Sequence, residues 1–252
     1  MNKIYFTGDT HFGHKNILHY APKRCADIGV TCQKIEDKWV YTDIFTNVEI
    51  SEEDAIMRMD CFIIDKWNSI VDKHDEVYIL GDFSFHGVEK TQRIFHRLNG
   101  NKHLIIGNHD GSGSAIQGWA TCKQMRLLDC KKSRFDFLTE NKRLFMCHFP
   151  MQSWGYLEKG SIMLHGHCHG RIDALNESIP GLRLDVGWDG QKNMWSLEDI
   201  VEYMDNKKQN FNSDMDVVHW KDEEGSHYIV KNDDINQMIE KLIEEQKVPA
   251  VQ

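Results

Sequence analysis

The sequence predicts a protein of the α/β class, in which short buried strands alternate with amphipathic helices. The first observation is a set of five short apolar runs, each ending at or near a polar residue that can bind a metal. Buried strands whose functional loops meet at one edge of a sheet produce this arrangement. The second observation is that segments with helical periodicity lie between the runs. The five runs are Lys3–Gly8, Val77–Gly81, His103–Gly107, Leu144–Cys147 and Ile162–Leu164.

Three helices are expected from caps and apolar spacing. Ser51 is a good N-cap, and apolar residues with helical spacing follow it to about Lys73. A second helix is expected over Val88–Leu98, because an Asn-Gly pair follows that can end it. Ser196 is expected to cap a third helix that runs to about Asp205.

Two segments depart from this alternation. Ala21–Ile50 has weak periodicity, and we expect a long insertion there, such as a lid or a binding loop. After Asp205, the segments Val217–Trp220 and His227–Val230 are expected to form a β-hairpin. Apolar positions over Ile235–Ile243 predict an amphipathic helix, which would dock on the main domain or form a dimer interface. We therefore expect a main domain of residues 1–205 and an extension of residues 206–252.

The composition is that of an ordinary globular protein. Of the 252 residues, 40% are hydrophobic and 27% are charged, and no run of apolar residues is long enough for a transmembrane helix. The seven cysteines form no C-x-x-C motif, and the first ten residues do not resemble a signal peptide, so we expect reduced thiols and a cytoplasmic location. The net charge of −9 counts weakly against a general nucleic-acid-binding protein.

The polar residues at the strand ends form a set of candidate metal ligands. Carboxylate, imidazole and amide groups together suit a first-row divalent metal. Residues i and i+2 of an extended chain point the same way, so Asp9 can reach the same point as His11. Two metals with four protein ligands each need only seven residues if Asp82 bridges both ions. The candidates are Asp9, His11, Asp82, Asn108, His148, His167 and His169.

Five motifs occur in order along residues 1–203: D-x-H, G-D, G-N-H-D, a single H and G-H-x-H. This ordered set resembles the calcineurin-like metallophosphoesterases. Two finer stretches, Asp9–Ile17 and Leu184–Gly187, are similar to a subfamily of small bacterial and phage phosphoesterases. The resemblance implies a four-layer α/β/β/α sandwich of two mixed sheets. Residues 206–252 have no counterpart in this resemblance.

The resemblance also implies two metal ions and a role for each motif. The first metal would be held by Asp9, His11, Asp82 and His169. The second metal would be held by Asp82, Asn108, His148 and His167. A hydroxide between the metals would attack phosphorus, and His109 would protonate the leaving oxygen as a general acid. Asp110 would orient His109. The nitrogen-rich ligand set favours manganese, with iron, zinc, nickel or cobalt as alternatives.

Three further residues are candidates for substrate contacts. His14 lies shortly after His11 and would contact the substrate phosphate or support His11. His86 follows Asp82 closely and could line the pocket. Arg24, in the long insertion, could clamp a phosphate group.

These observations favour a metal-dependent phosphohydrolase, and specifically a phosphodiesterase that acts on a nucleotide or another small phosphoester. The alternatives are a nuclease and a phosphomonoesterase, including a protein phosphatase. A nuclease needs a basic groove, for which the basic stretch Lys123–Arg143 is a candidate. A non-catalytic scaffold is disfavoured, because all seven ligand positions and His109 are present. No membrane partner is expected.

Overall fold

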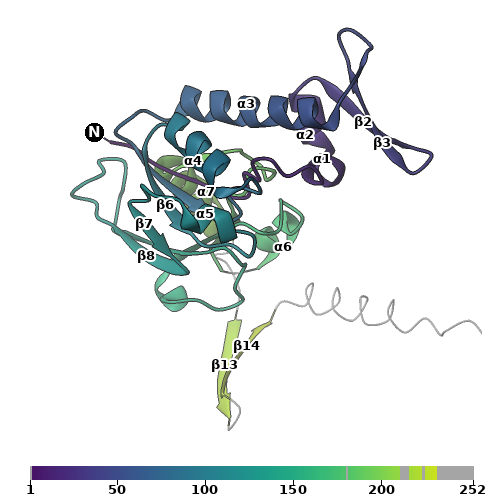
Figure 1. The fold of residues 1–252 in the computed structure, drawn as a ribbon. Coiled ribbons are helices and arrows are strands. Elements are labelled where there is room, and N and C mark those ends of the chain that lie inside the picture. The colour runs from purple at the N-terminus through teal and green to yellow at the C-terminus, as the bar shows by residue number, and fades with distance from the viewer. Residues whose placement is uncertain (1, 180, 211–215, 223–224, 232–252) are drawn as a thin grey trace, which may run out of the picture. The chain divides into compact units, whose positions relative to one another are not determined.

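The computed structural model describes residues 2–179, 181–210, 216–222 and 225–231 (Figure 1). The chain divides into two compact units, residues 1–204 and residues 205–252, which are described separately. No helix in the described ranges is long and apolar enough to cross a membrane. The seven cysteines, all within these ranges, are free.

The first unit contains two mixed sheets, which confirms the α/β class. The five-stranded sheet has the order β12-β1-β5-β6-β7, with β12 antiparallel to β1 and the other pairs parallel. Its strands are β1 (Ile4–Thr7), β5 (Glu76–Leu80), β6 (Asn101–Ile105), β7 (Thr121–Lys123) and β12 (Trp195–Ser196).

The four-stranded sheet has the order β11-β10-β9-β8, in which only the pair of β8 and β9 is antiparallel. Its strands are β8 (Met125–Cys130), β9 (Lys142–Cys147), β10 (Ile162–His165) and β11 (Arg183–Asp185). All five predicted strands are therefore present, as β1, β5, β6, β9 and β10. Because β1, β5 and β6 are parallel neighbours, their carboxyl ends lie at the same sheet edge, and so do those of β9 and β10.

The three predicted helices form, and both predicted N-caps, Ser51 and Ser196, accept a backbone hydrogen bond. The Ser51 hydroxyl accepts a hydrogen bond from the N–H of Asp54 (3.0 Å) and starts α3 (Glu52–Ile70). This helix ends earlier than expected, because Val71 is already extended. The second is α4 (Val88–Arg97), and the third, α7 (Leu197–Asn210), continues past Asp205. Short helices not predicted from the sequence are α1 (Ile17–Tyr20), α5 (Gly111–Ala115) and α6 (Asp173–Ser178), with a 3₁₀ turn at Leu157–Lys159.

Strand β5 shows how alternate residues of one strand serve two cores. Val77 and Ile79 join a cluster that contains Trp67 of α3. Leu80 belongs to a second cluster that contains Leu164 of β10, so side chains of the two sheets meet there. The strands thus bury both faces, which explains their continuous apolar sequences.

Residues 21–50, the expected long insertion, contain regular structure that their weak periodicity did not reveal. They contain α2 (Pro22–Asp27) and a three-stranded antiparallel sheet of β2 (Val30–Ile35), β3 (Lys38–Asp43) and β4 (Glu49–Ile50). Glu36 and Asp37 both have positive φ angles (46° and 65°). Such a two-residue turn matches the twist of a tight hairpin.

In the second unit, β13 (Asp216–Asp222) and β14 (Gly225–Lys231) form an antiparallel hairpin with Trp220 opposite His227. The hairpin predicted from the sequence is therefore confirmed. The helix predicted over Ile235–Ile243 lies outside the described residues.

Candidate metal centre

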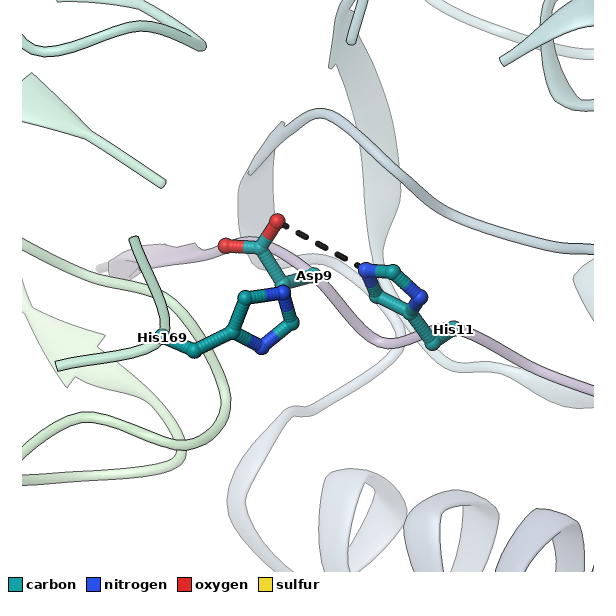
Figure 2. A group of neighbouring side chains, drawn as sticks. All are labelled: Asp9, His11 and His169. Carbon is teal, nitrogen blue, oxygen red and sulfur yellow. Dashed lines mark ion pairs between the residues drawn. The ribbon is translucent and has the colours of Figure 1, made fainter. Parts of the chain in front are cut away.

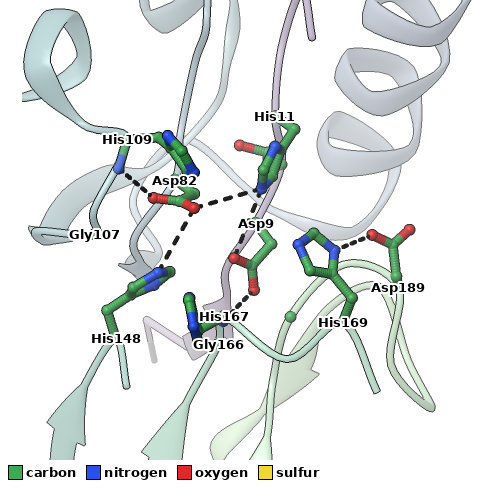
Figure 3. A network of polar contacts seen from close by, with 12 residues as sticks. Asp9, His11, Asp82, Gly107, His109, His148, Gly166, His167, His169 and Asp189 are labelled. Carbon is green, nitrogen blue, oxygen red and sulfur yellow. Dashed lines mark hydrogen bonds and ion pairs between the residues drawn. The ribbon is translucent and has the colours of Figure 1, made fainter. Parts of the chain in front are cut away.

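The carboxyl ends of five strands bring the predicted ligands together (Figure 3). The loop after β1 carries Asp9 and His11, and the residue after Gly81 at the end of β5 is Asp82. The remaining ligands follow β6, β9 and β10 in the same way. They are Asn108, His148, His167 and His169.

One group of side chains that could hold a metal ion consists of Asp9, His11 and His169 (Figure 2). One ligand atom of each lies within 4.8 Å of the others. His11 Nε2 is 3.8 Å from Asp9 Oδ1. This distance is too long for a hydrogen bond, and a metal ion between the two atoms could be coordinated by both.

A second group consists of Asp9, Asp82 and His148. The Asp82 Oδ2 atom lies 3.6 Å from His148 Nε2 and also 3.6 Å from His11 Nε2. Asp82 therefore lies between imidazoles of both predicted ligand sets, where a bridging carboxylate is required. Asp9 belongs to both groups, so it also lies close to both positions.

Asn108 connects the remaining two imidazoles. Its Oδ1 atom lies 2.9 Å from His148 Nε2 and 3.1 Å from His167 Nδ1. The amide oxygen and the two ring nitrogens thus converge, as the predicted second ligand set requires. His148 Nδ1 donates to the carbonyl of Leu80 (2.7 Å), which directs Nε2 to the centre.

Two buried atoms at the centre test whether these residues fit a metal. Asp9 Oδ1 and His11 Nε2 have no hydrogen-bond partner in the part of the chain that the structure describes. Asp9 is fully buried and His11 is 3% exposed. Leaving a buried polar atom unpaired costs about 1–3 kcal/mol, and a cation between the two atoms would remove that cost. The donor set therefore fits a divalent metal.

The electrostatics of the centre agree with this fit. Burial raises the pKa of Asp9 well above its usual value, and the negative charges of Asp185 and Asp82 raise it further. Burial also lowers the pKa of His11, and the nearby Arg24 guanidinium acts in the same direction. Near a bound cation the charged form of the Asp9 carboxylate would be favoured, which opposes the upward shift of its pKa caused by burial.

The backbone is strained at most of the ligand positions. A left-handed conformation costs a residue other than glycine about 1–2 kcal/mol, and such residues cluster at functional sites. The sharp turns at the strand ends aim these side chains inward. The ligands with positive φ are Asp9 (52°), His11 (53°), Asp82 (53°), His167 (68°) and His169 (51°).

Two glycines leave the space that the ligands occupy. A Cβ atom on Gly81, which has a φ of 87°, would lie 2.2 Å from His148 Nδ1. A Cβ atom on Gly107 would lie 2.3 Å from Asp82 Oδ1. These distances are too short for any side chain, so the ligands can approach the strand ends only beside glycine.

His109 lies at the exposed side of the centre without joining either metal group. Its backbone N–H donates to Asp82 Oδ1 (2.9 Å), which fixes the residue beside the predicted bridge. Its ring centroid lies 6.3 Å from that of His11 and 4.9 Å from that of Phe85. The imidazole is thus accessible to a substrate while the main chain is anchored.

Asp110 does not orient the His109 ring, which corrects the prediction from the sequence. Its carboxylate is 2% exposed and accepts three backbone hydrogen bonds of 2.8 Å. The donors are the N–H groups of Asp82, Phe83 and Gly107. Asp110 therefore connects the loops after β5 and β6.

Neither His14 nor His86 belongs to the groups that could hold a metal ion. His14 Nδ1 lies 2.9 Å from His11 Nδ1, and its ring stacks on Phe85 with centroids 3.8 Å apart. Burial lowers the pKa of His14 to about 4. The structure thus favours the alternative in which His14 supports His11. His86 Nε2 pairs with Asp60 Oδ2 (2.7 Å), so that ring nitrogen is engaged by α3, and the pocket-lining role of His86 stays a prediction.

Arg24 is not placed to clamp a phosphate, which corrects a further prediction. The side chain is 3% exposed and forms a bidentate pair with Asp189 (2.7 and 2.8 Å). Asp189 was not among the predicted site residues, although its Oδ2 atom lies 2.7 Å from His169 Nδ1. Burial raises the pKa of Asp189, but Arg24 and His169 outweigh that effect and hold it below its usual value. The signal was present, since Asp189 comes two residues after Gly187, the end of the stretch Leu184–Gly187 that carries part of the resemblance.

The fold and the site define a mixed α/β protein with Asp/His groups that could hold a metal ion. No family model matches the chain. "Gene 66 protein" of Mycobacterium phage L5 is 25% identical over 257 residues, which cover 90% of this chain and 100% of the phage protein. An uncharacterized protein of Methanocaldococcus jannaschii is 29% identical over 171 residues, covering 67% of this chain and 70% of the archaeal protein.

A crystal structure of a protein of unknown function from Aquifex aeolicus is also similar. Its TM-score is 0.55 at 19% identity, and the match covers 81% of this chain and all of that chain. This likeness shows a shared fold, and the names of the relatives assign no activity.

Proposed function

We propose that this chain is a metal-dependent phosphohydrolase of the calcineurin-like type that binds two divalent metal ions, with manganese the first choice. The favoured activity is hydrolysis of a phosphodiester in a nucleotide or another small molecule. The proposal is carried by the convergence of the predicted ligands. Five of them form the two groups that could hold a metal ion, where Asp9 Oδ1 and His11 Nε2 are unpaired, and Asn108 joins His148 to His167.

The packing supports the finer fold proposal. Side chains of both mixed sheets join one apolar cluster, while α3 and α4 pack on the other face of the five-stranded sheet. A third cluster, around Trp154 and Met163, lies on the other face of the four-stranded sheet. We propose the four-layer α/β/β/α arrangement on this basis. A cytoplasmic location is proposed from the free cysteines and remains a prediction.

In this mechanism the protein residues bind, orient and donate a proton. When bound, two divalent cations would supply positive charge for the phosphate and lower the pKa of an attacking water. Asp82 would contribute to both metal positions, and Asp9 would contribute to the first. The attacking water gives a proton to solvent as its oxygen bonds to phosphorus, and the bond to the leaving oxygen breaks. A His109 ring nitrogen gives the leaving oxygen its proton and regains one from solvent.

A substrate panel tests the proposal. Wild-type protein loaded with manganese is assayed on aryl phosphodiesters and monoesters, on cyclic and linear nucleotides, and on short single and double strands. We expect the highest kcat/KM on a small diester. The Asp82→Asn variant, which serves as the control, should hydrolyse none of these substrates. Preference for strands would favour a nuclease, and preference for monoesters a phosphomonoesterase. Metal binding without any hydrolysis would leave only the scaffold interpretation.

A further inference from the structure

The buried pair of Arg24 and Asp189 connects residues 21–50 to one of the predicted metal ligands. Arg24 lies on α2 and Asp189 follows β11, 165 residues further along the chain. Both Asp189 oxygens accept from the guanidinium, through Nε (2.7 Å) and Nη2 (2.8 Å). A bidentate contact of this kind fixes the plane of the carboxylate as well as its position.

The same carboxylate determines how His169 faces the centre (Figure 3). Asp189 Oδ2 accepts a hydrogen bond from His169 Nδ1 at 2.7 Å. A neutral imidazole that donates through Nδ1 keeps its lone pair on Nε2. Nε2 is then the ring nitrogen that is free to bind a metal ion. Asp9 and His11 are the other members of the group that could hold that ion.

Arg24 also supports the strained main chain beside the first ligands. Its Nη2 atom donates to the carbonyl of Asp9 (2.6 Å), and Nη1 donates to the carbonyl of Thr10 (2.8 Å). Asp9 and His11 both have positive φ angles, so these carbonyls belong to the turn that aims the two ligands. One buried side chain therefore contacts the segment of Asp9 and His11 directly and His169 through Asp189.

We propose that Arg24 and Asp189 are positioning residues that hold His169 as the Nδ1–H tautomer, with Nε2 toward Asp9 and His11. Metal affinity at this group then depends on a residue of the 21–50 segment. The inference rests on the metal-binding part of the proposed function. When a metal ligand loses the residue that its other ring nitrogen hydrogen-bonds, metal binding typically weakens about 10–100-fold.

The test combines metal titration with NMR of the histidine ring nitrogens. In Asp189→Asn and Arg24→Met, one of two manganese ions should bind about 10–100-fold more weakly, while the second ion is unaffected. Arg24→Lys should not restore affinity, because an ammonium group cannot form the bidentate contact. The matched control is Arg58→Met, which breaks the other arginine–aspartate pair of this region, between Arg58 and Asp43 (2.6 Å).

The ¹⁵N shifts of His169 in metal-free protein give an independent measurement. Wild type should show protonated Nδ1 and unprotonated Nε2, and Asp189→Asn should change that tautomer ratio. The opposite tautomer in wild type, or equal weakening of both metals in the folded variants, would overturn the inference. If wild type binds no metal, the proposed function fails, whereas the tautomer measurement still decides whether the pair positions His169.

Discussion

At the scale of single residues, Asp82 is the carboxylate that lies between the two predicted ligand sets. One of its oxygens lies between His11 and His148, and the other accepts from the backbone of His109. Asp9 is fully buried and belongs to both metal groups, yet one of its oxygens is unpaired. The two carboxylates therefore provide a comparison of bridging with terminal binding.

We predict that Asp82→Asn loses more metal than any other single change at the centre. An amide lacks the negative charge that a bridge between two cations needs. Metal content per chain after dialysis is the measurement, and Asp9→Asn is the matched comparison. Full occupancy and activity in Asp82→Asn would contradict the assignment of two metals.

We predict that His109→Ala separates chemistry from metal binding. A general acid contributes about 10²–10⁴-fold to the rate, so turnover of an ester with a poor leaving group should fall by that factor. Both metals should remain bound, because the His109 ring belongs to neither metal group. The loss should shrink with an aryl oxide leaving group, which departs without protonation.

The control for this prediction is His96→Ala, which removes an exposed imidazole on α4 that contacts Gln92. Steady-state rates on two esters that differ in leaving-group pKa decide the result. An equal loss on both esters would show that His109 does not protonate the leaving oxygen, and loss of a metal would show that it is a ligand.

At the scale of elements, the loops after β5 and β6 are held together by the Asp110 carboxylate. Its three backbone donors include the N–H of Asp82 and that of Gly107, which directly precedes the ligand Asn108. The position of two ligands thus depends on hydrogen bonds that neither ligand side chain makes.

We predict that Asp110→Asn lowers the free energy of unfolding by about 3 kcal/mol, because backbone N–H groups lose a charged acceptor and one of them meets an amide NH₂. Metal content should fall as well. Urea denaturation is the measurement. Ser51→Ala, which removes the α3 N-cap, should cost about 1 kcal/mol without loss of metal. Unchanged stability with a shifted pH–rate profile would instead show that Asp110 acts on His109.

At the scale of the whole molecule, the predicted ligands all belong to the first unit. Every predicted ligand lies before residue 204, the boundary between the units. The helix α7 continues to Asn210, so a truncation after Asp205 would cut within a helix.

We therefore predict that a chain ending at Asn210 retains its metals and its turnover of a generic phosphodiester. Metal content, circular dichroism and steady-state rates compare it with the full chain. Sedimentation velocity should also show whether residues 211–252 are needed for self-association. Loss of turnover with unchanged spectrum and metal content would show that the extension shapes the active site.

The sequence alone determined the strand ends and the residues that they carry. Apolar runs followed by Asp9, Asp82, Asn108 and His148 are local patterns, and parallel strands bring their carboxyl ends to one edge. The N-cap at Ser51 could likewise be predicted from the sequence, because a cap depends on residues within one turn. Residues 21–50 show no comparable pattern, because their short strands lack clear alternation.

Only the tertiary structure decided which partners the buried charged groups have. Arg24 pairs with Asp189 across 165 residues, and Asp110 binds the backbone of a neighbouring loop instead of the adjacent His109. Burying a charge is costly unless it is paired, so each charged group takes the partner that packing places beside it. That partner is set by the arrangement of the sheets, whereas the identity of the metal ligands is set by the local order of residues at each strand end.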